Sequence, residues 1–447
     1  MKKIGMVSLG CPKNTVDTEL ALGDLLQNGY QWTADHEDAD VLIVNTCGFI
    51  ESAKKESIDA IFEMAQLKTE GKCTKLVVTG CLSQRYGEEL VKEIPEIDLL
   101  MGVDGYPQLK NLLLKESTES EEDRRPSLIP EYFEAYGQRE LITPFYSAYL
   151  KIGEGCSFKC AFCYIPKIRG AFRSRTIESI VEETTALAAK GVREFNLVSQ
   201  VTTLYGNDLG LKNGLVQLLK ELAKVKGVDW LRLLYCYPTL INEAFLECVR
   251  DEEKVCNYID VPLQHIDNDM LKLMKRQETE TLVRNMIENC RNKIPDVALR
   301  TTFIVGFPGE TEERFQKLAN FLEEAQFDHV GIFVYSDEEG TSAFDYTDKV
   351  PTQLAEERKN ELMRIQKEIS FRKNQERVGK TYPVLVEGME EQSFLVTGRA
   401  TFQAPEIDGQ IIIEESDVEP GQIIQMQIDR TLEYDLVAKV LETEPVS

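Results

Sequence analysis

The chain has 447 residues, which at about 150 residues per domain corresponds to about three domains. Its composition, 43% hydrophobic and 28% charged, is ordinary for a globular protein that buries a large core without disulfides. Acidic residues outnumber basic ones 76 to 51 and give a net charge of −25, which excludes a nucleic-acid coat held by bulk positive charge. The charge is compatible with a cationic protein partner.

No apolar run approaches the roughly 18 residues that a membrane helix needs. The apolar stretch from Ile4 to Cys11 is too short for a signal peptide, and Gly5, Ser8 and Gly10 dilute it. We therefore predict a first β-strand there and a cytoplasmic protein without membrane contact. The 11 cysteines, an odd number, favour metal or cluster ligation over a disulfide framework.

Strand and helix patterns alternate through residues 1–115. Apolar runs predict strands, and apolar spacing near 3.6 residues predicts the helices between them. This alternation is typical of a parallel sheet covered by helices. The expected strands are 4–9, 41–45 and 76–79, and the expected helices are 16–27 and 50–67.

Residues 116–139 have a different composition. The stretch 116–131 combines six acidic residues, two arginines and two prolines, which cannot contribute to a packed core. We expect a linker.

Residues 140–375 return to strand–helix alternation, with about six βα units that indicate a partial or full parallel barrel. The expected strands are 148–152, 194–199, 230–235, 258–262, 299–305 and 330–335, with helices such as 177–189 and 311–325 between them. A long charged helix is expected at 352–378.

The segment 379–443 changes character again. Short strand-like runs at 382–387, 394–400, 410–414, 423–428 and 436–442 are separated by Gly, Pro and Asp, which predicts a small all-β barrel. This segment holds 13 acidic and 4 basic residues.

The strongest local motif is C-x3-C-x2-C, formed by Cys156, Cys160 and Cys163 just after the first strand of the barrel-like segment. Three thiolates on one tight loop can each bind one iron of a four-iron cluster. No fourth cysteine follows, so one iron would stay open for a small chelating ligand. The alternative is a zinc site, which usually shows paired C-x2-C units and four ligands.

A second set of cysteines is spread along the first segment. Cys11, Cys47 and Cys81 each lie just past the carboxyl end of a predicted strand. In a parallel sheet these ends share one edge, where ligands bind, so the three side chains are expected to converge. The alternative is three unrelated core cysteines. The other five cysteines share no such placement and are expected to be structural: Cys73, Cys236, Cys248, Cys256 and Cys290.

Both triplets, with several short strings, make the chain resemble the methylthiotransferase family of radical S-adenosylmethionine (SAM) enzymes. The resemblance covers essentially the whole chain. Its strings are S-L-G-C-P-K-N, N-T-C-G-F-I, V-T-G-C-L-S-Q-R, R-G-A-F-R-S-R, P-L-Q-H and F-I-V-G-F-P-G-E-T. It implies an α/β fold with an amino-terminal parallel sheet domain at 1–115, a radical-SAM (βα) partial barrel at 140–375 and an all-β TRAM barrel at 379–443.

The resemblance also implies cofactors. Cys156, Cys160 and Cys163 would hold the radical-SAM 4Fe-4S cluster, and Cys11, Cys47 and Cys81 an auxiliary 4Fe-4S cluster. SAM would serve as radical source and as methyl donor. Such cofactors carry the radical chemistry, while the protein orients the substrate and excludes water. No Ser/His/Asp triad is expected, because the β-carbon of aspartate is not acidic enough for ordinary proton transfer.

Further residues have assignments that rest on the resemblance or on position. Phe162 would lie beside the SAM adenine or shield the cluster, and Ser199 and Gln200 end the second barrel strand, where barrel active sites gather. Gly306 and Gly309 would let the backbone approach the adenine, or are plain turn glycines. At Val201 the related branch usually has aspartate, so no carboxylate role can be carried over to that position.

Four basic residues are candidates for substrate binding. Arg169, Arg173 and Arg175 form a turn that would pair with the SAM carboxylate or the substrate aspartate, or would simply be solvated. His265 of P-L-Q-H would face the mouth of the barrel as a substrate contact, or would be a structural histidine.

Several strings and the acidic final segment resemble the branch that acts on an aspartate of a small-subunit ribosomal protein, uS12. An acidic barrel attracts such a basic protein and repels phosphate, so transfer RNA, the substrate of the sister branch, is disfavoured. The resemblance implies a sulfur donor and an electron donor such as flavodoxin or ferredoxin. An alternative of another class is a non-catalytic two-cluster electron carrier.

Overall fold

The computed structural model describes residues 1–114, 139–389, 395–414 and 417–441. All but the last residue of the expected linker at 116–139 lies outside these ranges. Three sheets organise the described chain, namely two open sheets whose strands all run parallel and one closed five-stranded barrel. This confirms the predicted fold class. No described helix combines the length and apolarity needed to cross a membrane.

The first sheet is built from residues 3–100 in the order β2-β1-β3-β4-β5. Its central strand β3, V-L-I-V-N-T, is buried along its whole length, as expected for a parallel strand covered on both faces. The strands are β1 (Lys3–Ser8), β2 (Gln31–Trp32), β3 (Val41–Thr46), β4 (Lys75–Gly80) and β5 (Leu99–Leu100).

Helices cover both faces of the first sheet, and the two-residue period of β3 decides which side chains meet them. Val41 and Ile43 pack with α1 (Pro12–Gln27) and α4 (Tyr106–Leu113). Leu42 and Val44 pack on the other side. The helices on that side are α2 (Glu51–Glu70) and α3 (Cys81–Glu93).

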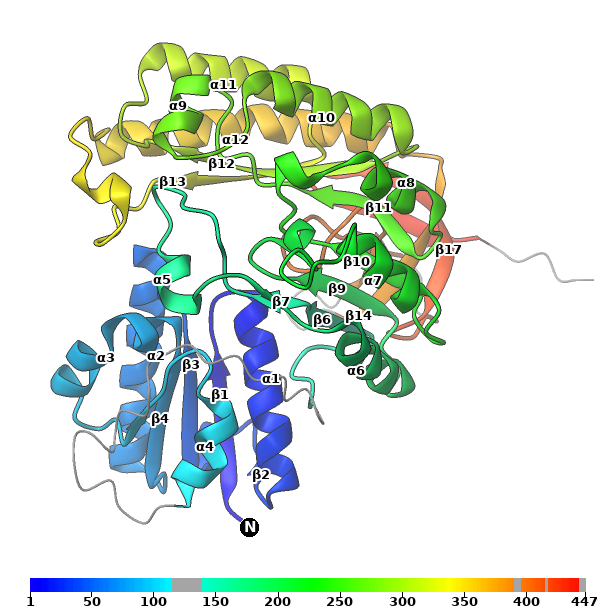
Figure 1. Cartoon of the computed structure of the whole chain (residues 1–447). Helices are drawn as coiled ribbons and strands as arrows, with labels where there is room; N and C mark the ends of the chain where they lie inside the picture. The colour runs from blue at the N-terminus through cyan, green and yellow to red at the C-terminus, as the bar shows by residue number, and fades with distance from the viewer. Residues whose placement is uncertain (115–138, 390–394, 415–416, 442–447) are drawn as a thin grey trace, which may run out of the picture.

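The second sheet is a six-stranded partial barrel with the order β13-β12-β11-β10-β9-β6. Its strands are β6 (Ser147–Lys151), β9 (Glu194–Val198), β10 (Trp230–Leu233), β11 (Val255–Asp260), β12 (Ala298–Val305) and β13 (His329–Val334). The helices around it are α6 (Ile177–Ala189), α7 (Gly214–Ala223), α8 (Glu243–Asp251), α9 (Asn268–Leu273), α10 (Glu280–Lys293), α11 (Glu312–Ala325) and α12 (Thr352–Gln375). In Figure 1, α10, α11 and α12 lie side by side at the top of the molecule.

The closed barrel has the order β14-β15-β16-β18-β17. It packs against the face of the six-stranded sheet that the helices leave uncovered. On β10, Leu231 and Leu233 face the helices, whereas Trp230 shares a core with barrel residues such as Val384. The barrel strands are β14 (Thr381–Met389), β15 (Val396–Ala400), β16 (Ile411–Ile413), β17 (Ile423–Thr431) and β18 (Leu436–Val440).

Helix α1 of the first domain lies against β6 at the edge of the six-stranded sheet (Figure 1). Buried ion pairs join the two domains there. Glu19 of α1 pairs with Arg139, and Asp17 of α1 pairs with Lys151 of β6. Contacts between charged groups removed from water depend strongly on geometry, so they fix the relative position of the domains.

Several boundaries predicted from the sequence differ from those in the structure. The strand expected at 258–262 is β11, which begins at Val255 and ends at Asp260. The helix expected to end at residue 378 ends at Gln375. The strand expected to start at 394 is described only from residue 395 onward, and β15 begins at Val396.

Candidate functional site

The structure brings the three cysteines of the first domain to one edge of the sheet. Cys11 follows β1 and is the N-cap of α1, and Cys81 is the first residue of α3 directly after β4. Cys47 follows β3, before α2 begins at Glu51. The parallel order of the strands therefore places the three thiols beside three helix N-termini, whose dipoles favour negative charge.

Backbone packing shows how closely the three loops approach each other. A side-chain carbon added at Gly10 would lie 2.6 Å from Cβ and 2.8 Å from Sγ of Cys47. One added at Gly48 would lie 3.0 Å from the backbone carbon of Cys81. The glycines beside the cysteines are thus required for the convergence of the trio.

Asn14 and Asn45, which sequence reasoning did not single out, support this edge. Nδ2 of Asn14 donates to the carbonyl oxygens of Leu9 and Thr46, at 3.0 and 2.9 Å. Nδ2 of Asn45 donates to the carbonyl oxygen of Asn14 at 2.9 Å. Both asparagines lie within three residues of a trio cysteine, Asn14 in C-P-K-N and Asn45 in N-T-C. This proximity in the sequence could have indicated them.

Arg169 links the trio to the second domain. Its Nη2 donates to Oδ1 of Asn14 at 2.5 Å and lies 3.4 Å from Sγ of Cys81. Its Nη1 donates to Glu154 at 2.8 Å and also pairs with Asp17 at 3.3 Å. The side chain is fully buried, so its charge is satisfied by these groups.

The thiols of this trio differ in electrostatic environment. Burial raises the pKa of Cys81 to about 12, although Arg169 opposes the effect. Burial also acts to raise the pKa of Cys11, but Lys13, Arg169 and the backbone N–H of Asn14 outweigh it and lower the pKa. Cys11 is therefore the member of the trio most ready to act as a thiolate ligand.

The second trio lies on the loop after β6 and the short strand β7 (Gly153–Glu154). The backbone N–H of Cys156 donates to Gly170 at 3.0 Å, and that of Cys163 donates to Cys160 at 3.2 Å. The three thiols are half-buried, and burial raises the pKa of Cys163 to about 12. These backbone bonds hold the loop in a tight turn, which suits three ligands of one cluster.

A second buried arginine reaches this trio. Nη1 of Arg276 lies 4.0 Å from Sγ of Cys160, and its Nε donates to Glu278 at 2.5 Å. The guanidinium lies 4.3 Å from the ring of Tyr237, which stacks on Phe158 at 4.0 Å between centroids. Arg276 was not expected from the sequence, because it is 113 residues beyond Cys163.

The two trios lie on elements that face each other. Helix α5 (Ile165–Arg169) starts two residues after Cys163, and its last residue reaches Cys81. Ile168 of α5 packs in one apolar cluster with Cys81 and Val103. The loop that carries one trio is thus continuous with a helix that touches the other.

In the described parts of the chain, no three His, Cys, Asp or Glu side chains converge closely enough to hold one metal ion. A four-iron cluster needs no such convergence, since each cysteine binds a different iron. The donors of both trios are all sulfur, and such donor sets fit iron–sulfur clusters. The remaining five cysteines are buried in hydrophobic cores: Cys73, Cys236, Cys248, Cys256 and Cys290.

Three residues expected to bind SAM lie on two segments. Phe162 directly precedes Cys163 of the second trio, and Ser199 and Gln200 directly follow β9. Phe162 packs edge-on against Phe307, with 6.5 Å between ring centroids. Oγ of the buried Ser199 accepts from the backbone N–H of Val201 at 3.1 Å. Nε2 of Gln200 donates to Glu154 at 2.7 Å, and its Oε1 is buried without a hydrogen bond. Val201 is itself buried, and nothing in the structure explains why it replaces a carboxylate.

The structure places His265, expected as a substrate contact or a structural histidine, beside Glu310. Its ring is fully buried, and Nδ1 accepts from the backbone N–H of Asp267 at 3.0 Å. Its Nε2 lies 3.4 Å from Glu310, whose carboxylate accepts from Gly306 N–H. These contacts favour a structural histidine, and the substrate contact stays a prediction.

Gly306 and Gly309 both have positive φ, at +74° and +85°. A side-chain carbon at Gly306 would lie 2.4 Å from Cβ of Ala355 in α12, so helix packing alone requires this glycine. At Gly309 the nearest atom would be the Leu273 side chain at 3.1 Å.

The arginine turn is less solvated than expected. Nη1 of Arg175 donates to Glu183 at 2.5 Å and to the carbonyl oxygen of Lys151 at 2.8 Å, and the side chain is fully buried. Glu183 therefore neutralises Arg175 in this structure, and the substrate role of Arg175 stays a prediction. Arg173 lies 3.6 Å from Asp104 and remains partly exposed.

Lys13, which belongs to the first helical turn after Cys11, points toward the second domain. Its Nζ lies 3.6 Å above the ring centroid of Tyr235, just past the carboxyl end of β10. Burial acts to lower the pKa of Lys13, but Tyr235 and Cys11 outweigh it and raise the pKa. The ammonium is held charged between the two domains.

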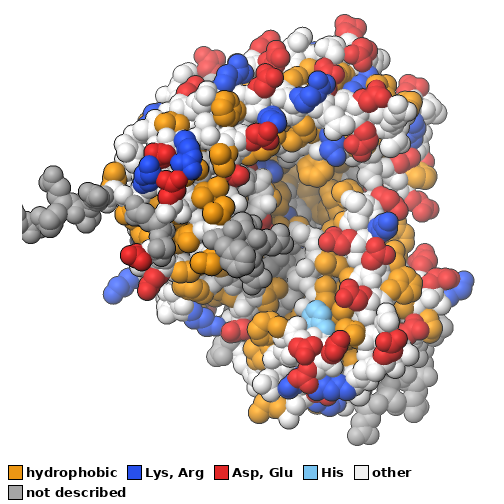
Figure 2. All heavy atoms as spheres, turned by 180° about the vertical axis from the view of Figure 1, so that it is seen from behind, with side chains coloured by type: hydrophobic (Ala, Val, Ile, Leu, Met, Phe, Trp, Pro, Cys, Tyr) orange, Lys and Arg blue, Asp and Glu red, His pale blue; other side chains and the backbone are white. Residues whose placement is uncertain are grey.

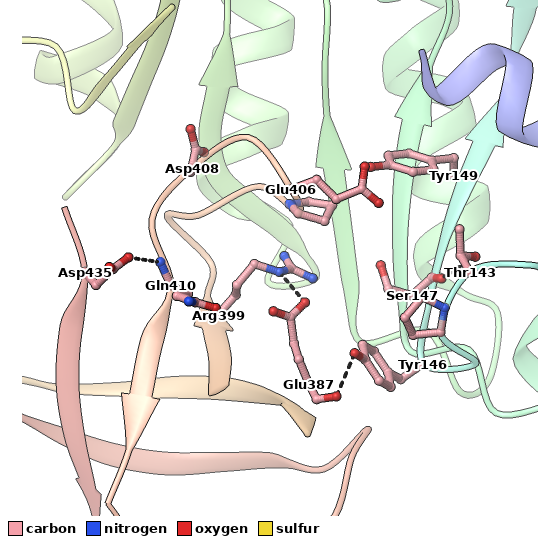
Figure 3. Close-up of a pocket in the computed structure, with 12 residues that line it drawn as sticks. Thr143, Tyr146, Ser147, Tyr149, Glu387, Arg399, Glu406, Asp408, Gln410 and Asp435 are labelled. Atoms are coloured by element: carbon pink, nitrogen blue, oxygen red, sulfur yellow. Dashed lines mark hydrogen bonds and ion pairs between the residues drawn. The ribbon is translucent and has the colours of Figure 1, made fainter. Parts of the chain in front are cut away.

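Two hollows are visible on the molecule. Figure 2 shows a recess near the centre of the rear face, with hydrophobic side chains at its floor. A cavity of about 400 Å³ lies between β6 and the closed barrel, where Tyr149 and Glu406 point toward each other (Figure 3). No residue expected at the site lines this cavity.

Three family models match the chain. Residues 3–102 match "Uncharacterized protein family UPF0004", residues 150–322 match the "Radical SAM superfamily", and residues 378–441 match the "TRAM domain". Each match lies on one of the three sheets described above.

Curated relatives match over nearly the full length. The chain is 46% identical to "Ribosomal protein uS12 methylthiotransferase RimO" of Geobacter sulfurreducens, covering 98% of this chain and 99% of the relative. It is also 46% identical to the protein of that name from Desulforamulus reducens, covering 99% of this chain and 100% of the relative.

Solved structures share the fold. The radical SAM methyltransferase TsrM from Kitasatospora setae matches with a TM-score of 0.56 and 14% identity, over 74% of this chain and 73% of that one. The cobalamin-dependent enzyme OxsB matches with a TM-score of 0.54 and 13% identity, over 82% of this chain and 56% of that one. From its full-length relatives, the chain belongs to the RimO family of radical SAM methylthiotransferases, enzymes that use SAM and 4Fe-4S clusters.

Proposed function

We propose that the chain methylthiolates the β-carbon of an aspartate in ribosomal protein uS12. The two cysteine trios hold two 4Fe-4S clusters, Cys156, Cys160 and Cys163 the one that cleaves SAM and Cys11, Cys47 and Cys81 the auxiliary one. The observation that carries the proposal is the contact of Arg169 with Cys81. It joins the loop of one trio to the other trio, so both would serve one substrate.

When bound, SAM and the clusters supply a radical that can break an unactivated C–H bond. The protein's own residues position the two trios and exclude water. The buried network around Arg169 fixes the two trios relative to each other. Three cysteine ligands leave one vertex of each cluster for a ligand other than cysteine. Phe158, Tyr237 and Phe162 provide apolar walls that exclude water from this region.

The substrate and partners follow from charge and from the relatives. The chain has a net charge of −25, which favours association with a basic ribosomal protein over transfer RNA. An electron donor such as flavodoxin or ferredoxin and a sulfur donor complete the reaction. We place the activity in the cytoplasm, where newly made ribosomal proteins are accessible.

The cluster assignment is tested by iron and sulfide analysis of the anaerobically reconstituted protein. We expect about eight irons in the wild type and about four in each of Cys11→Ala and Cys156→Ala. Cys73→Ala is the matched control, because Cys73 is buried in a hydrophobic core, and it should keep all the iron. Equal iron in wild type and Cys11→Ala would contradict an auxiliary cluster at this trio.

The activity is tested by incubating the reconstituted protein with SAM, reductant and sulfide, together with either uS12 or transfer RNA. Mass spectrometry should find the methylthio group on an aspartate of uS12 alone. A modified nucleoside with unmodified uS12 would overturn the assignment. Absence of 5′-deoxyadenosine would instead favour an electron carrier.

A further inference from the structure

Lys13 is a buried cation at the junction of the two domains. It exposes 7% of its surface and belongs to the first turn of the 16-residue helix α1. A positive charge at a helix N-terminus is unfavourable, because the helix dipole is positive there. Burial of an ammonium adds a large desolvation cost unless an anion compensates it.

Among the described residues, no carboxylate forms an ion pair or hydrogen bond with Lys13. Its one close partner is the ring face of Tyr235, 3.6 Å from Nζ. Cys11 lies two residues before Lys13 in the chain, and we expect its thiolate to bind iron. The ammonium is thus left with a cation–π contact, which is weaker than a buried ion pair.

The neighbouring charges are already matched with one another. Asp17 and Glu154 pair with Lys151 and Arg169, and Asp104 lies beside Arg173. Lys13 is therefore the unmatched positive charge of this cluster. One further negative charge would complete it.

We propose that Lys13 binds the side-chain carboxylate of the substrate aspartate. This inference rests on the proposed function and identifies the group that the site recognises. The β-carbon of aspartate is bonded to its carboxylate carbon, so an anchored carboxylate fixes the position of the carbon to be modified. Lys13 is two residues from Cys11, and this anchor places that carbon beside the auxiliary trio.

Tyr235 sets the position of Lys13. It has a positive φ of +62°, a strained conformation for a residue other than glycine. Its backbone N–H donates to Asp260 at 2.8 Å, and Asp260 is held by Arg300 at 3.1 Å. The ring is therefore fixed beneath the ammonium by groups on the neighbouring strands.

The test is a double-mutant cycle between Lys13→Met and uS12 in which asparagine replaces the target aspartate. Affinity for uS12 is measured by titration calorimetry with the cluster-loaded enzyme. Either change alone should weaken binding on the order of 10- to 100-fold, the range for a hydrogen bond to a charged group. The two changes together should weaken binding no more than either change alone, because each of them removes the same contact.

Controls separate this role from structural damage. Lys13→Arg keeps the charge and should retain most of the preference for aspartate over asparagine. Lys55→Met removes an exposed lysine of the same domain and should change nothing. Iron content and SAM affinity should match the wild type in every variant.

Three results overturn the inference. Additive losses in the cycle would mean that Lys13 does not contact the carboxylate. Loss of SAM affinity in Lys13→Met with an unchanged preference for aspartate would assign Lys13 to SAM. Loss of iron would make it a support for the cluster loop. Failure of the wild type to bind or modify uS12 would instead remove the proposed function.

Discussion

At the residue scale, each cysteine trio receives one buried arginine. Arg169 reaches Cys81 at 3.4 Å, and Arg276 reaches Cys160 at 4.0 Å. Hydrogen bonds to sulfur and nearby positive charge stabilise the reduced state of an iron–sulfur cluster and raise its reduction potential. The two arginines come from different elements, so the potentials of the two clusters can be set independently.

We expect Arg169→Met to make the reduction potential of the auxiliary cluster more negative and to leave the radical-SAM cluster unchanged. Arg276→Met is the matched control. It should make the reduction potential of the radical-SAM cluster more negative and leave the auxiliary cluster unchanged. Potentiometric titration followed by electron paramagnetic resonance, in backgrounds that keep one cluster each (Cys156→Ala or Cys11→Ala), measures both. Equal shifts of both clusters in either variant would show that the arginines act through the fold and not through the sulfur contacts.

The sequence predicted the cysteines but not the side chains around them. Each cysteine of the first trio follows a strand of a parallel sheet, so topology alone predicts that they meet. Arg276 and Tyr235 reach the site from elements far along the chain, and no short motif records that contact. The strand-end position of His265 did not show that its ring lies beside Glu310.

At the element scale, α12 is held close to the end of β12 by a glycine. Gly306 has φ +74°, and the Cβ of an alanine there would lie 2.4 Å from Cβ of Ala355. A buried ion pair between Arg358 of α12 and Glu310, at 2.8 Å, supports the same contact. These two contacts therefore hold α12 against the segment that follows β12.

We expect Gly306→Ala to lower the free energy of unfolding by about 2–5 kcal/mol, from left-handed backbone strain together with overpacking. Gly210→Ala is the control, since Gly210 has φ +70° but no atom within 4 Å of the added carbon. It should cost only the backbone part, about 1–2 kcal/mol. Urea unfolding measures both, and equal losses would show that α12 moves to accommodate the methyl group.

The sequence predicted whether a segment is a helix or a strand, but it did not predict the residues at which these elements begin and end. A continuous apolar run predicted β3, and a helical pattern of apolar residues predicted α11. β11 was shifted because Val255 and Cys256 extend the strand into a region that the sequence shows as a polar loop. Its pairing with β10 and β12 decides the boundary, and pairing is not visible in the sequence.

At the scale of the whole molecule, one carboxylate joins the closed barrel to the six-stranded sheet. Glu194 at the start of β9 accepts from Arg232 of β10 at 3.0 Å and from Arg399 of β15 at 2.6 Å. Arg399 also pairs with Glu387 at the cavity between the two parts, as Figure 3 shows. No sequence pattern indicates this pairing, since Glu194 and Arg399 lie 205 residues apart.

The same carboxylate makes the docking of the barrel sensitive to acid. Burial acts to raise the pKa of Glu194, but Arg399 and Arg232 outweigh it and hold the pKa at about 2, against an ordinary value of 4.5. A depressed pKa means that the unfolded chain binds the proton more readily. The stability from this group is therefore complete above pH 4.5 and is lost as the pH falls toward 2.

Glu194→Gln should lower the free energy of unfolding at pH 7 by about 3–5 kcal/mol, because two buried guanidinium groups lose a shared counter-charge. The difference from wild type should narrow by about 2 kcal/mol between pH 7 and pH 3, since the unfolded wild-type chain binds a proton at Glu194 in this range and the folded chain largely does not. Urea unfolding of the cluster-free proteins between pH 7 and 3 measures this. Glu414→Gln removes a half-exposed partner of Arg430 and should cost at most about 1 kcal/mol. A difference that stays constant with pH would show that Glu194 joins the barrel to the sheet by packing and not by its charge.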